Sequence, residues 1–314
     1  MAALSSMAQS VEFSVNEGLR NASLKSRIEW TITNFLQTCN SAFAGRGALQ
    51  FPAELMSEDA AKSVQLLWNN MPFRCGEERI IERILHTYAG YQIRNIPIIV
   101  RNGSNKSAYQ ELVIDLDESG IITRVNLAIP NHLYRKVFSG GAEVSDLRHR
   151  QMILDYVEQF RTAYNRKDIH FLEQVFSDDA LIITGKVIRR KRGDHTAVLK
   201  DKHEIIYKEQ SKKEYLNRLR TQIFPSASYI RVNFSDIKLS RHPSIAGYYG
   251  VTIRQGYESS IYSDDGYLFM LWDFRDENCP QIHVRTWQPY WMDENKTSRL
   301  DENRVFGIND FKVE

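Results

Sequence analysis

An internal repeat constrains the fold of this chain more than any other feature. Residues 32–43 and 153–164 carry apolar side chains at matching positions, so that Ile32 corresponds to Ile153. These apolar residues recur at i, i+3, i+4 and i+7, which is typical of an amphipathic helix with one buried stripe. Matched order at two places in one chain is difficult to obtain by chance. The sequence therefore predicts a tandem duplication.

The repeat continues beyond each helix. Residues 51–60 end in Ser-Glu-Asp-Ala, and residues 171–180 end in Ser-Asp-Asp-Ala. Residues 109–115 and 267–273 also correspond, and a turn-forming cluster follows each, as in antiparallel hairpins. Because helices come first and strands follow in both copies, we expect an α+β fold rather than an alternating α/β plan. Each copy is predicted to contain a long helix, a second short helix and a mostly antiparallel sheet.

The repeat also predicts the domain organisation of the 314 residues, a length typical of about two domains. The predicted parts are an N-terminal segment (1–27), a first and more divergent domain (28–137), a linker (138–147), a second domain (148–292) and a polar tail (293–314). Ser145 or Asp146 is a good cap for the helix that opens the second domain. We expect the tail to be poorly ordered up to Arg304, with a short strand at residues 305–308.

Charge and cysteine content exclude several classes of protein. With 41 basic and 39 acidic residues, the chain lacks the concentrated positive charge that binds nucleic acid or anionic membranes. Its one basic run, residues 186–192, is interpreted as a solvated hairpin tip. Cys39, Cys75 and Cys279 have no metal-binding or redox spacing, so we expect three reduced thiols. No stretch approaches the ~20 apolar residues that span a bilayer. We expect neither a metal nor a cofactor.

The first ten residues, MAALSSMAQS, leave two interpretations open. Their small side chains are similar to the end of a secretory signal, but a basic n-region and a full apolar h-region are missing. The segment is either a disordered start or the remainder of a longer signal peptide. The predicted localisation depends on which of these holds.

The second copy resembles the nuclear transport factor 2-like superfamily. The similarity rests on the helix that runs into Ala163–Glu173, on the Ser177–Ala180 entry into a strand, and on the closing strand Ile282–Pro289. It covers residues 148–292 and, more weakly through the repeat, residues 28–134. The chain also resembles uncharacterised two-copy proteins of this superfamily from Bacteroidota, which are generally exported to the cell envelope. The resemblance implies two tandem cone-shaped domains, each with helices packed on a curved sheet and a pocket at the open end. It implies the envelope or periplasm as location, with the cytoplasm as the alternative.

The isomerases of this superfamily use chemistry that can be compared with this sequence. They need a carboxylate base, which should follow the Asp-Asp-Ala motif by four positions, and a tyrosine on the first helix as an oxyanion donor. The base position carries Thr184, and the donor position falls at Phe160. Neither side chain can do that chemistry, so no catalytic residue is assigned. A non-catalytic ligand- or protein-binding module is the leading hypothesis. A small-molecule enzyme of isomerase, dehydratase or hydrolase type, using His283 or Asp273, is the alternative.

Polar and aromatic side chains are concentrated in the second copy. The candidate ligand-binding residues are Tyr164, Arg254, Tyr257, Tyr267, His283, Arg285 and Trp287. Arg254 and Arg285 together could hold a carboxylate or phosphate, because guanidinium groups match such anions bidentately, and the aromatic rings would form an apolar wall. The alternative interpretation is structural, since aromatics are common in strands and sheet arginines often pair with a nearby aspartate.

Alternation along Ile282–Pro289 predicts which side chains share a face of the sheet. Ile282, Val284 and Thr286 should face the core, as Val125 should in the first copy. The opposite face should carry His283, Arg285 and Trp287, where the first copy has Arg124, Asn126 and Ala128. A large aromatic on an outer face favours a covering partner. This partner is either another protein or the other copy, in an intramolecular pseudo-dimer.

Overall fold

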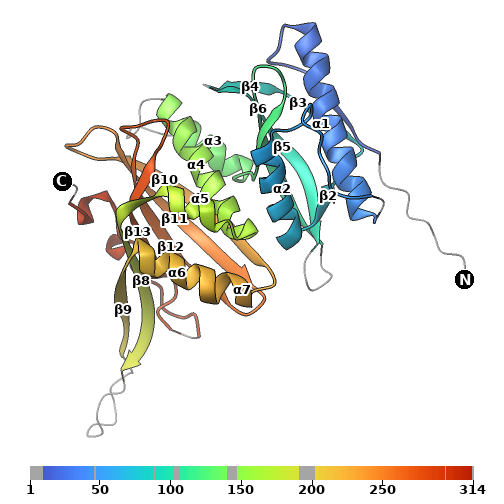
Figure 1. Ribbon diagram of the computed structural model, residues 1–314. Helices are drawn as coiled ribbons and strands as arrows, with labels where there is room; N and C mark the ends of the chain where they lie inside the picture. Colours follow the sequence, from blue (N-terminus) through green and yellow to red (C-terminus); the bar gives the residue numbers. More distant parts are fainter. Residues whose placement is uncertain are drawn as a thin grey trace, which may run out of the picture. The chain divides into compact units, whose positions relative to one another are not determined.

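The computed structural model describes residues 10–45, 47–87, 89–101, 107–139, 147–190, 202–293 and 295–312. Its contacts divide the chain into two units. The first unit is Met1–Asn131, Tyr156–Asp168 and Ser228–Ile230, and the second is His132–Asp155, Ile169–Ala227 and Arg231–Glu314. Each unit combines helices with a mostly antiparallel sheet (Figure 1), so the predicted α+β class is confirmed.

The first unit is built on a five-stranded sheet. Its main elements are α1 (Ala22–Phe43), α2 (Glu58–Asn70), β2 (Phe73–Cys75), β4 (Ile84–Thr87), β5 (Gly90–Arg101), β6 (Ser107–Leu116) and β7 (Ile122–Leu127). The strand order is β2-β5-β6-β7, with β4 also paired to β5, and β1 (Glu12–Val15) pairs with β3 (Arg79–Glu82) in a separate parallel ribbon. Helix α1 buries Ile32, Phe35, Leu36 and Cys39, which confirms the predicted apolar stripe.

The second helix of the first unit begins later than the repeat predicts. Ser57 is the N-cap of α2, and its side chain accepts a hydrogen bond from the backbone of Ala60. Glu58 and Asp59 occupy the first turn, where negative charge is favourable. The matching Ser177–Ala180 segment lies instead inside a strand. Similar residues therefore begin a helix at Ser57 and lie within strand β8 at Ser177–Ala180.

The second unit is built on a six-stranded sheet in the order β10-β11-β12-β13-β8-β9. Its strands are β8 (Phe176–Arg190), β9 (Lys202–Ser211), β10 (Ile230–Arg241), β11 (Tyr248–Ser259), β12 (Ser263–Asp273) and β13 (Gln281–Pro289). Strands β13 and β8 are parallel, whereas the pairs β11–β12, β12–β13 and β8–β9 are antiparallel.

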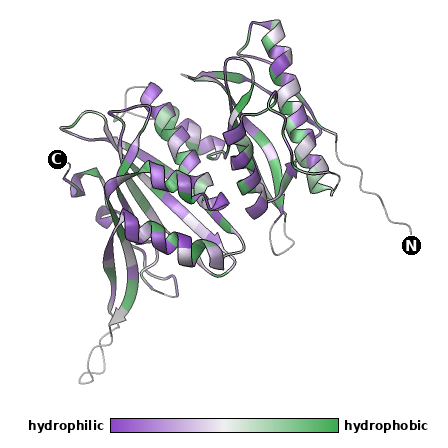
Figure 2. Ribbon diagram, in the orientation of Figure 1, coloured by the Kyte–Doolittle hydropathy of each residue, from purple (hydrophilic) through white to green (hydrophobic). Residues whose placement is uncertain are grey.

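The helices of the second half are both apolar and polar along their length (Figure 2), as expected for elements with one buried side. They are α3 (Asn131–Ser139), α4 (Leu147–Arg166), α5 (Ile169–Val175), α6 (Lys212–Arg218), the π-helical turn η1 (Leu219–Ile223) and α7 (Phe224–Ser226). Helix α3 was not predicted. Of the predicted linker, residues 140–146, including Ser145 and Asp146, lie outside the described residues.

A β-bulge in β13 overturns the predicted face assignment. Ile282 pairs with Trp272, but Val284 already pairs with Leu271, so His283 is an extra residue in the strand. A bulge shifts the alternation of side chains by one position. Ile282 therefore shares a face with Arg285, which pairs with Met270 on the same side as Trp272.

The first unit has a corresponding irregularity in β7. Ile122 pairs with Leu116 and Arg124 pairs with Asp115, which leaves Thr123 as the extra residue. Counting from each bulge, Val125 corresponds to Arg285 and not to Val284. The predicted correspondence of Arg124, Asn126 and Ala128 with His283, Arg285 and Trp287 is therefore off by one position.

The polar tail packs on the sheet of the second unit, contrary to the prediction of poor order. Leu300 and Ile308 are buried, and Phe306 and Phe311 join the cluster of Phe269, Leu271 and Val284. Of the segment predicted as a strand, residues 305–307 form no regular structure and Ile308 begins a 3-10 turn; the two short 3-10 turns here are η2 (Glu302–Arg304) and η3 (Ile308–Asp310). The tail buries apolar side chains that are widely spaced in sequence, which no periodic pattern reveals.

Candidate functional site

A cavity lies in the second unit between the sheet and the C-terminal tail. Its volume is about 370 Å³, within the range of small-molecule sites. Residues from β10, β11 and β12, the residue after β13 and residues of the tail line it: Asp236, Lys238, Thr252, Arg254, Tyr267, Tyr290, Glu302, Val305, Phe306 and Gly307. Two of the predicted ligand-binding residues, Arg254 and Tyr267, thus share a pocket.

Arg254 stands on the face of β11 that the tail covers, opposite Tyr267 of β12. Its guanidinium carbon lies 3.1 Å from the ring centroid of Tyr290 and 5.3 Å from that of Tyr267. Nη2 donates a hydrogen bond to the Asp265 carboxylate. Nη1 is shielded from solvent and has no hydrogen-bond partner within the described part of the chain. The guanidinium is held by contacts with two aromatic rings and by one carboxylate, and its Nη1 can donate further hydrogen bonds.

Opposite charges around the pocket nearly cancel. Lys136 Nζ lies 2.6 Å from Asp236 Oδ1, and Lys238 Nζ lies 3.9 Å from Glu302 Oε2. Together with the Arg254–Asp265 pair, these contacts give the pocket no strong net field. A small monoanion or a zwitterion suits such a balance better than a polyphosphate.

Burial raises the pKa values of two groups beside Arg254. The pKa of Asp265 is raised by burial, and the charge of Arg254 offsets this only in part. Burial likewise raises the pKa of the Tyr267 hydroxyl, against the opposing effect of Arg254. Tyr267 is therefore a neutral hydrogen-bond donor at physiological pH.

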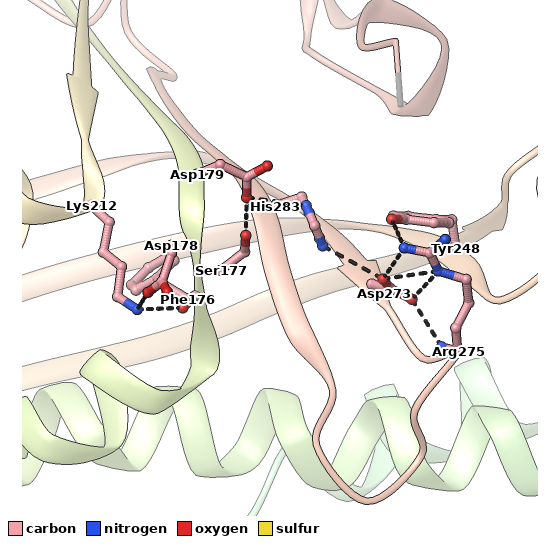
Figure 3. Close-up of polar contacts among 9 residues, drawn as sticks. All are labelled: Phe176, Ser177, Asp178, Asp179, Lys212, Tyr248, Asp273, Arg275 and His283. Carbon is pink, nitrogen blue, oxygen red and sulfur yellow. Dashed lines mark hydrogen bonds and ion pairs between the residues drawn. The ribbon is translucent and has the colours of Figure 1, made fainter. Parts of the chain in front are cut away.

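His283 occupies a different place on the same sheet (Figure 3). Its Nε2 lies 3.5 Å from Asp273 Oδ2, and its Nδ1 lies 3.6 Å from Asp179 Oδ1. The ring also packs edge-on against Tyr248, at 5.6 Å between centroids. Arg275 donates to the Asp273 carboxylate and, through Nη2, to the Tyr248 hydroxyl at 2.7 Å. The bulge places His283 between two carboxylates, and its side chain is 22% exposed.

The Asp273 carboxylate is stabilised in its charged form. Burial raises its pKa, but hydrogen bonds from Arg275 and Tyr248 and the charge of Arg275 outweigh burial, so the pKa is lowered overall. The pKa of Tyr248 is raised to about 12 by burial and by its hydrogen bond with Asp273.

Acid sensitivity follows from the lowered pKa of Asp273. Its contribution to stability is fully present above the ordinary carboxyl pKa of 3.8 and is lost as the pH falls through the lower folded value. Asp273→Asn is expected to lower the free energy of unfolding at neutral pH by at most about 1 kcal/mol, because the pair lies near the surface. The difference from the wild type should shrink below pH 4 in urea titrations followed by circular dichroism. A difference that is constant down to pH 2 would contradict this assignment.

Arg285 and Trp287 lie on the other face of the sheet from Arg254. Both side chains are buried, and the Arg285 guanidinium carbon stands 5.1 Å from the ring centroid of Tyr215 on α6. Trp287 packs over Gly266, where an added Cβ would come within 2.8 Å of the indole ring. Because the pairing register separates Arg254 from Arg285, the predicted joint anion site of these two arginines is wrong.

The remaining predicted residues lie elsewhere. Tyr257 is half-buried and its ring packs against Tyr262 at 6.2 Å. Tyr164, on the part of α4 that belongs to the first unit, is buried with its ring 5.0 Å from that of Phe160. Thr184 is paired in register with Trp287. The seven predicted ligand-binding residues therefore do not form one site.

Sequence reasoning missed the pocket residues that come from β10 and the tail. Tyr290, Glu302, Val305 and Phe306 follow the last strand, in or beside a segment predicted to be poorly ordered. Aromatic residues in the sequence could have indicated these positions. Tyr290 and Trp291 directly follow Pro289, and Phe306 and Phe311 lie in an otherwise polar tail. Large aromatics in a polar segment indicate packing against a core.

Two further observations concern the described part of the chain as a whole. None of its helices is long and apolar enough to cross a membrane. Cys39, Cys75 and Cys279 are all free thiols, as predicted, with the first two buried and the third exposed.

Comparison with known proteins shows partial likenesses to solved structures. No protein-family profile matches the sequence, and no curated protein matches it. A nuclear transport factor 2-like protein from Cytophaga hutchinsonii is 15% identical over 45% of this chain and 97% of its own, with a TM-score of 0.34. A naphthalene 1,2-dioxygenase with indole bound in the active site is 9% identical over 51% of this chain and 88% of its own (TM-score 0.36). A Bdellovibrio bacteriovorus protein is 12% identical over 72% of this chain and 78% of its own (TM-score 0.35).

Proposed function

We propose that the chain is a binding protein whose second unit holds a small planar monoanion in the pocket beside Arg254. The observation that carries this proposal is the state of the Arg254 guanidinium. It lines a cavity between aromatic rings, donates to a single carboxylate, and has a buried Nη1 without a partner among the described residues. A buried donor without an acceptor costs about 1–3 kcal/mol, and a ligand carboxylate would supply that acceptor.

The walls of the pocket favour a flat ligand. Tyr267, Tyr290 and Phe306 contribute aromatic surface, and aromatic side chains stack well on planar groups. The near balance of charge around the pocket favours one negative charge rather than several. Because Nη1 is shielded from solvent and the Tyr290 ring lies against the guanidinium, we expect the Arg254 side chain or the Tyr290 ring to rotate when a ligand binds. An aromatic carboxylate meets all of these conditions.

Thermal unfolding in the presence of small anions tests the proposal. We expect benzoate, 4-hydroxybenzoate or 2-naphthoate to raise the Tm of the wild type, because a ligand that binds only the native state stabilises it. Benzamide, which is neutral, and inorganic phosphate should have little effect. Arg254→Lys keeps the charge but loses the planar fork and should lose most of the stabilisation. Equal Tm shifts with benzoate and benzamide would overturn the proposed role of Arg254.

A hydrolytic enzyme that uses His283 is the second candidate. The observation in its favour is the position of the imidazole between Asp273 and Asp179, since a carboxylate orients a histidine that acts as a general base. Turnover of p-nitrophenyl acetate above the buffer rate, lost in His283→Ala and kept in Arg254→Ala, would support this candidate. Equal rates for the wild type and His283→Ala would remove it.

We also propose that two segments of the chain, residues 28–137 and residues 148–292, arose by tandem duplication. Support comes from one matching structural detail that the sequence repeat does not contain. Met56 forms a parallel bridge with Ile122, and Phe176 forms a parallel pair with Ile282, with a bulge directly after each partner. Bulges are specific local features that families tend to keep. A location in the cell envelope stays a prediction.

A further inference from the structure

Strand β9 forms one end of the six-stranded sheet in the second unit (Figure 1). It pairs with β8 in a continuous register from Leu181↔Ser211 to Arg190↔Lys202, without a bulge. Among the described residues, no strand pairs with its outer edge. A long regular edge strand presents a row of backbone donors and acceptors that can accept a further strand.

The side chains of β9 are unusual for an exposed edge. Ile206 is 48% exposed, so a large apolar side chain lies open to solvent in the middle of the strand. Tyr207 beside it is 37% exposed, although one side of its ring packs against Phe306. Charged residues flank them on both sides, with Glu204 before and Lys208 and Glu209 after. Because side chains alternate along a strand, Glu204, Ile206 and Lys208 share one face.

We propose that β9 pairs with β9 of a second copy of this chain, antiparallel and centred on Ile206. In this register Glu204 of each copy lies opposite Lys208 of the other, and Ile206 lies opposite its own equivalent. On the other face His203 lies opposite Glu209. Opposite charges directly across an antiparallel pair are stabilising, whereas like charges are destabilising. The strand is therefore complementary to itself from residue 203 to residue 209.

This register is specific. Shifting the centre by one residue along β9, which moves the pairing by two positions, places Glu204 opposite Ile206 or Gln210 and removes both Glu–Lys matches. The two-fold axis lies between the Ile206 residues of the two copies and is perpendicular to the sheet. The same face of each sheet therefore lies on the same side of the joined sheet. The result is an isologous dimer, in which the same strand serves both partners. A second copy fits this edge because the charge pattern of β9 is complementary to its own reverse.

Two charge-reversal variants and their mixture test the proposal in the full-length chain. Sedimentation velocity should show a concentration-dependent dimer for the wild type. In a Glu204→Lys dimer, two lysines would face each other at each of the two 204–208 pairs. In a Lys208→Glu dimer, two glutamates would face each other at the same pairs. Each variant alone should therefore be monomeric. Mixed in equal amounts, the two variants are complementary and should form a heterodimer. Lys213→Glu changes the same charge on the exposed start of α6 and should leave the dimer intact.

Each outcome has a defined meaning. Circular dichroism and Tm values near those of the wild type confirm that the variants fold, and the mixture reports on pairing even when one variant is less stable. A wild type that stays monomeric at every accessible concentration overturns the proposal. So does a dimer that persists in both single variants, because its interface must then lie elsewhere. The pocket beside Arg254 is not formed by β9, so loss of the dimer should leave benzoate binding unchanged.

Discussion

Replacing Glu158 by glutamine is expected to lower the free energy of unfolding by about 3–5 kcal/mol, the usual cost of removing one partner of a buried ion pair. The Glu158 side chain, in the part of α4 assigned to the first unit, is 1% exposed, and that of its partner Arg94 is 8% exposed. Arg94 Nη1 donates to Glu158 Oε2 at 3.0 Å, and the backbone N–H of Ile129 donates to Oε1 at 2.6 Å. The carboxylate thus joins a strand, a helix and the segment after β7.

A second buried arginine adds to this effect. Arg161 is also buried, with Nη1 donating to the carbonyl of Ala128 at 2.6 Å and Nη2 to Gln110 at 2.7 Å. Burial lowers its pKa to about 10, and the charge of Glu158 opposes that shift. In the Glu158→Gln variant, both Arg94 and Arg161 keep their positive charge in a buried environment without the compensating carboxylate.

Urea unfolding followed by circular dichroism measures this loss. Glu58→Gln is the matched control, because Glu58 also pairs with a cation, Lys62, but is exposed at the start of α2, and it should cause little change. Adding Arg94→Met to Glu158→Gln should restore part of the loss, since it removes one of the uncompensated charges. A Glu158→Gln variant within about 1 kcal/mol of the wild type would show that the pair is solvated.

Gln288→Ala is expected to release the C-terminal tail from the sheet and to cost about 2–4 kcal/mol of stability. Gln288 is fully buried, and its side chain amide holds the tail at two points. Oε1 accepts from the backbone N–H of Phe306 at 2.7 Å, and Nε2 donates to the carbonyl of Arg304 at 2.9 Å. Nε2 also donates to the Tyr207 hydroxyl at 2.9 Å. The variant leaves these three groups without their partner.

Hydrogen exchange provides the direct measurement for Gln288→Ala. Amides of residues 298–312 should exchange faster, while those of β11 and β12 should remain protected. Because Glu302, Val305 and Phe306 form one wall of the pocket, benzoate binding should weaken as well. Gln281→Ala, on the first residue of the same strand, is the control. Unchanged exchange in the tail of Gln288→Ala would mean that apolar packing alone holds it.

The sequence was sufficient to predict the α+β class and the amphipathic helices α1 and α4, but not α3 or the helices between β9 and β10. Those features follow from periodic burial, and the stripe of α1 through Ile32 and Leu36 shows how directly periodicity reports on a core. Strand pairing is less accessible, because one extra residue changes every face that follows it. The bulge at His283 has no composition signal, so the predicted alternation places Arg285 with His283 when the two lie on opposite faces.

The candidate site was predictable only in part. Arg254 and Tyr267 belong to strands with recognisable patterns, and both are candidates from the sequence alone. Their partners in the tail come from a segment without regular secondary structure, where burial follows from tertiary packing alone. Tyr290 directly follows β13 and was also missed, although it stacks directly on Arg254.

Isothermal titration of benzoate into the wild type, Arg254→Ala and Arg285→Ala tests the central claim most directly. A hydrogen bond to a charged group contributes about 1.5–3 kcal/mol, so Arg254→Ala should weaken binding by about 10- to 100-fold. Arg285→Ala removes the same charge from the opposite face of the sheet and should leave the affinity unchanged. Loss of binding in Arg285→Ala with full affinity in Arg254→Ala would contradict the account, as would a wild type that binds no aromatic carboxylate.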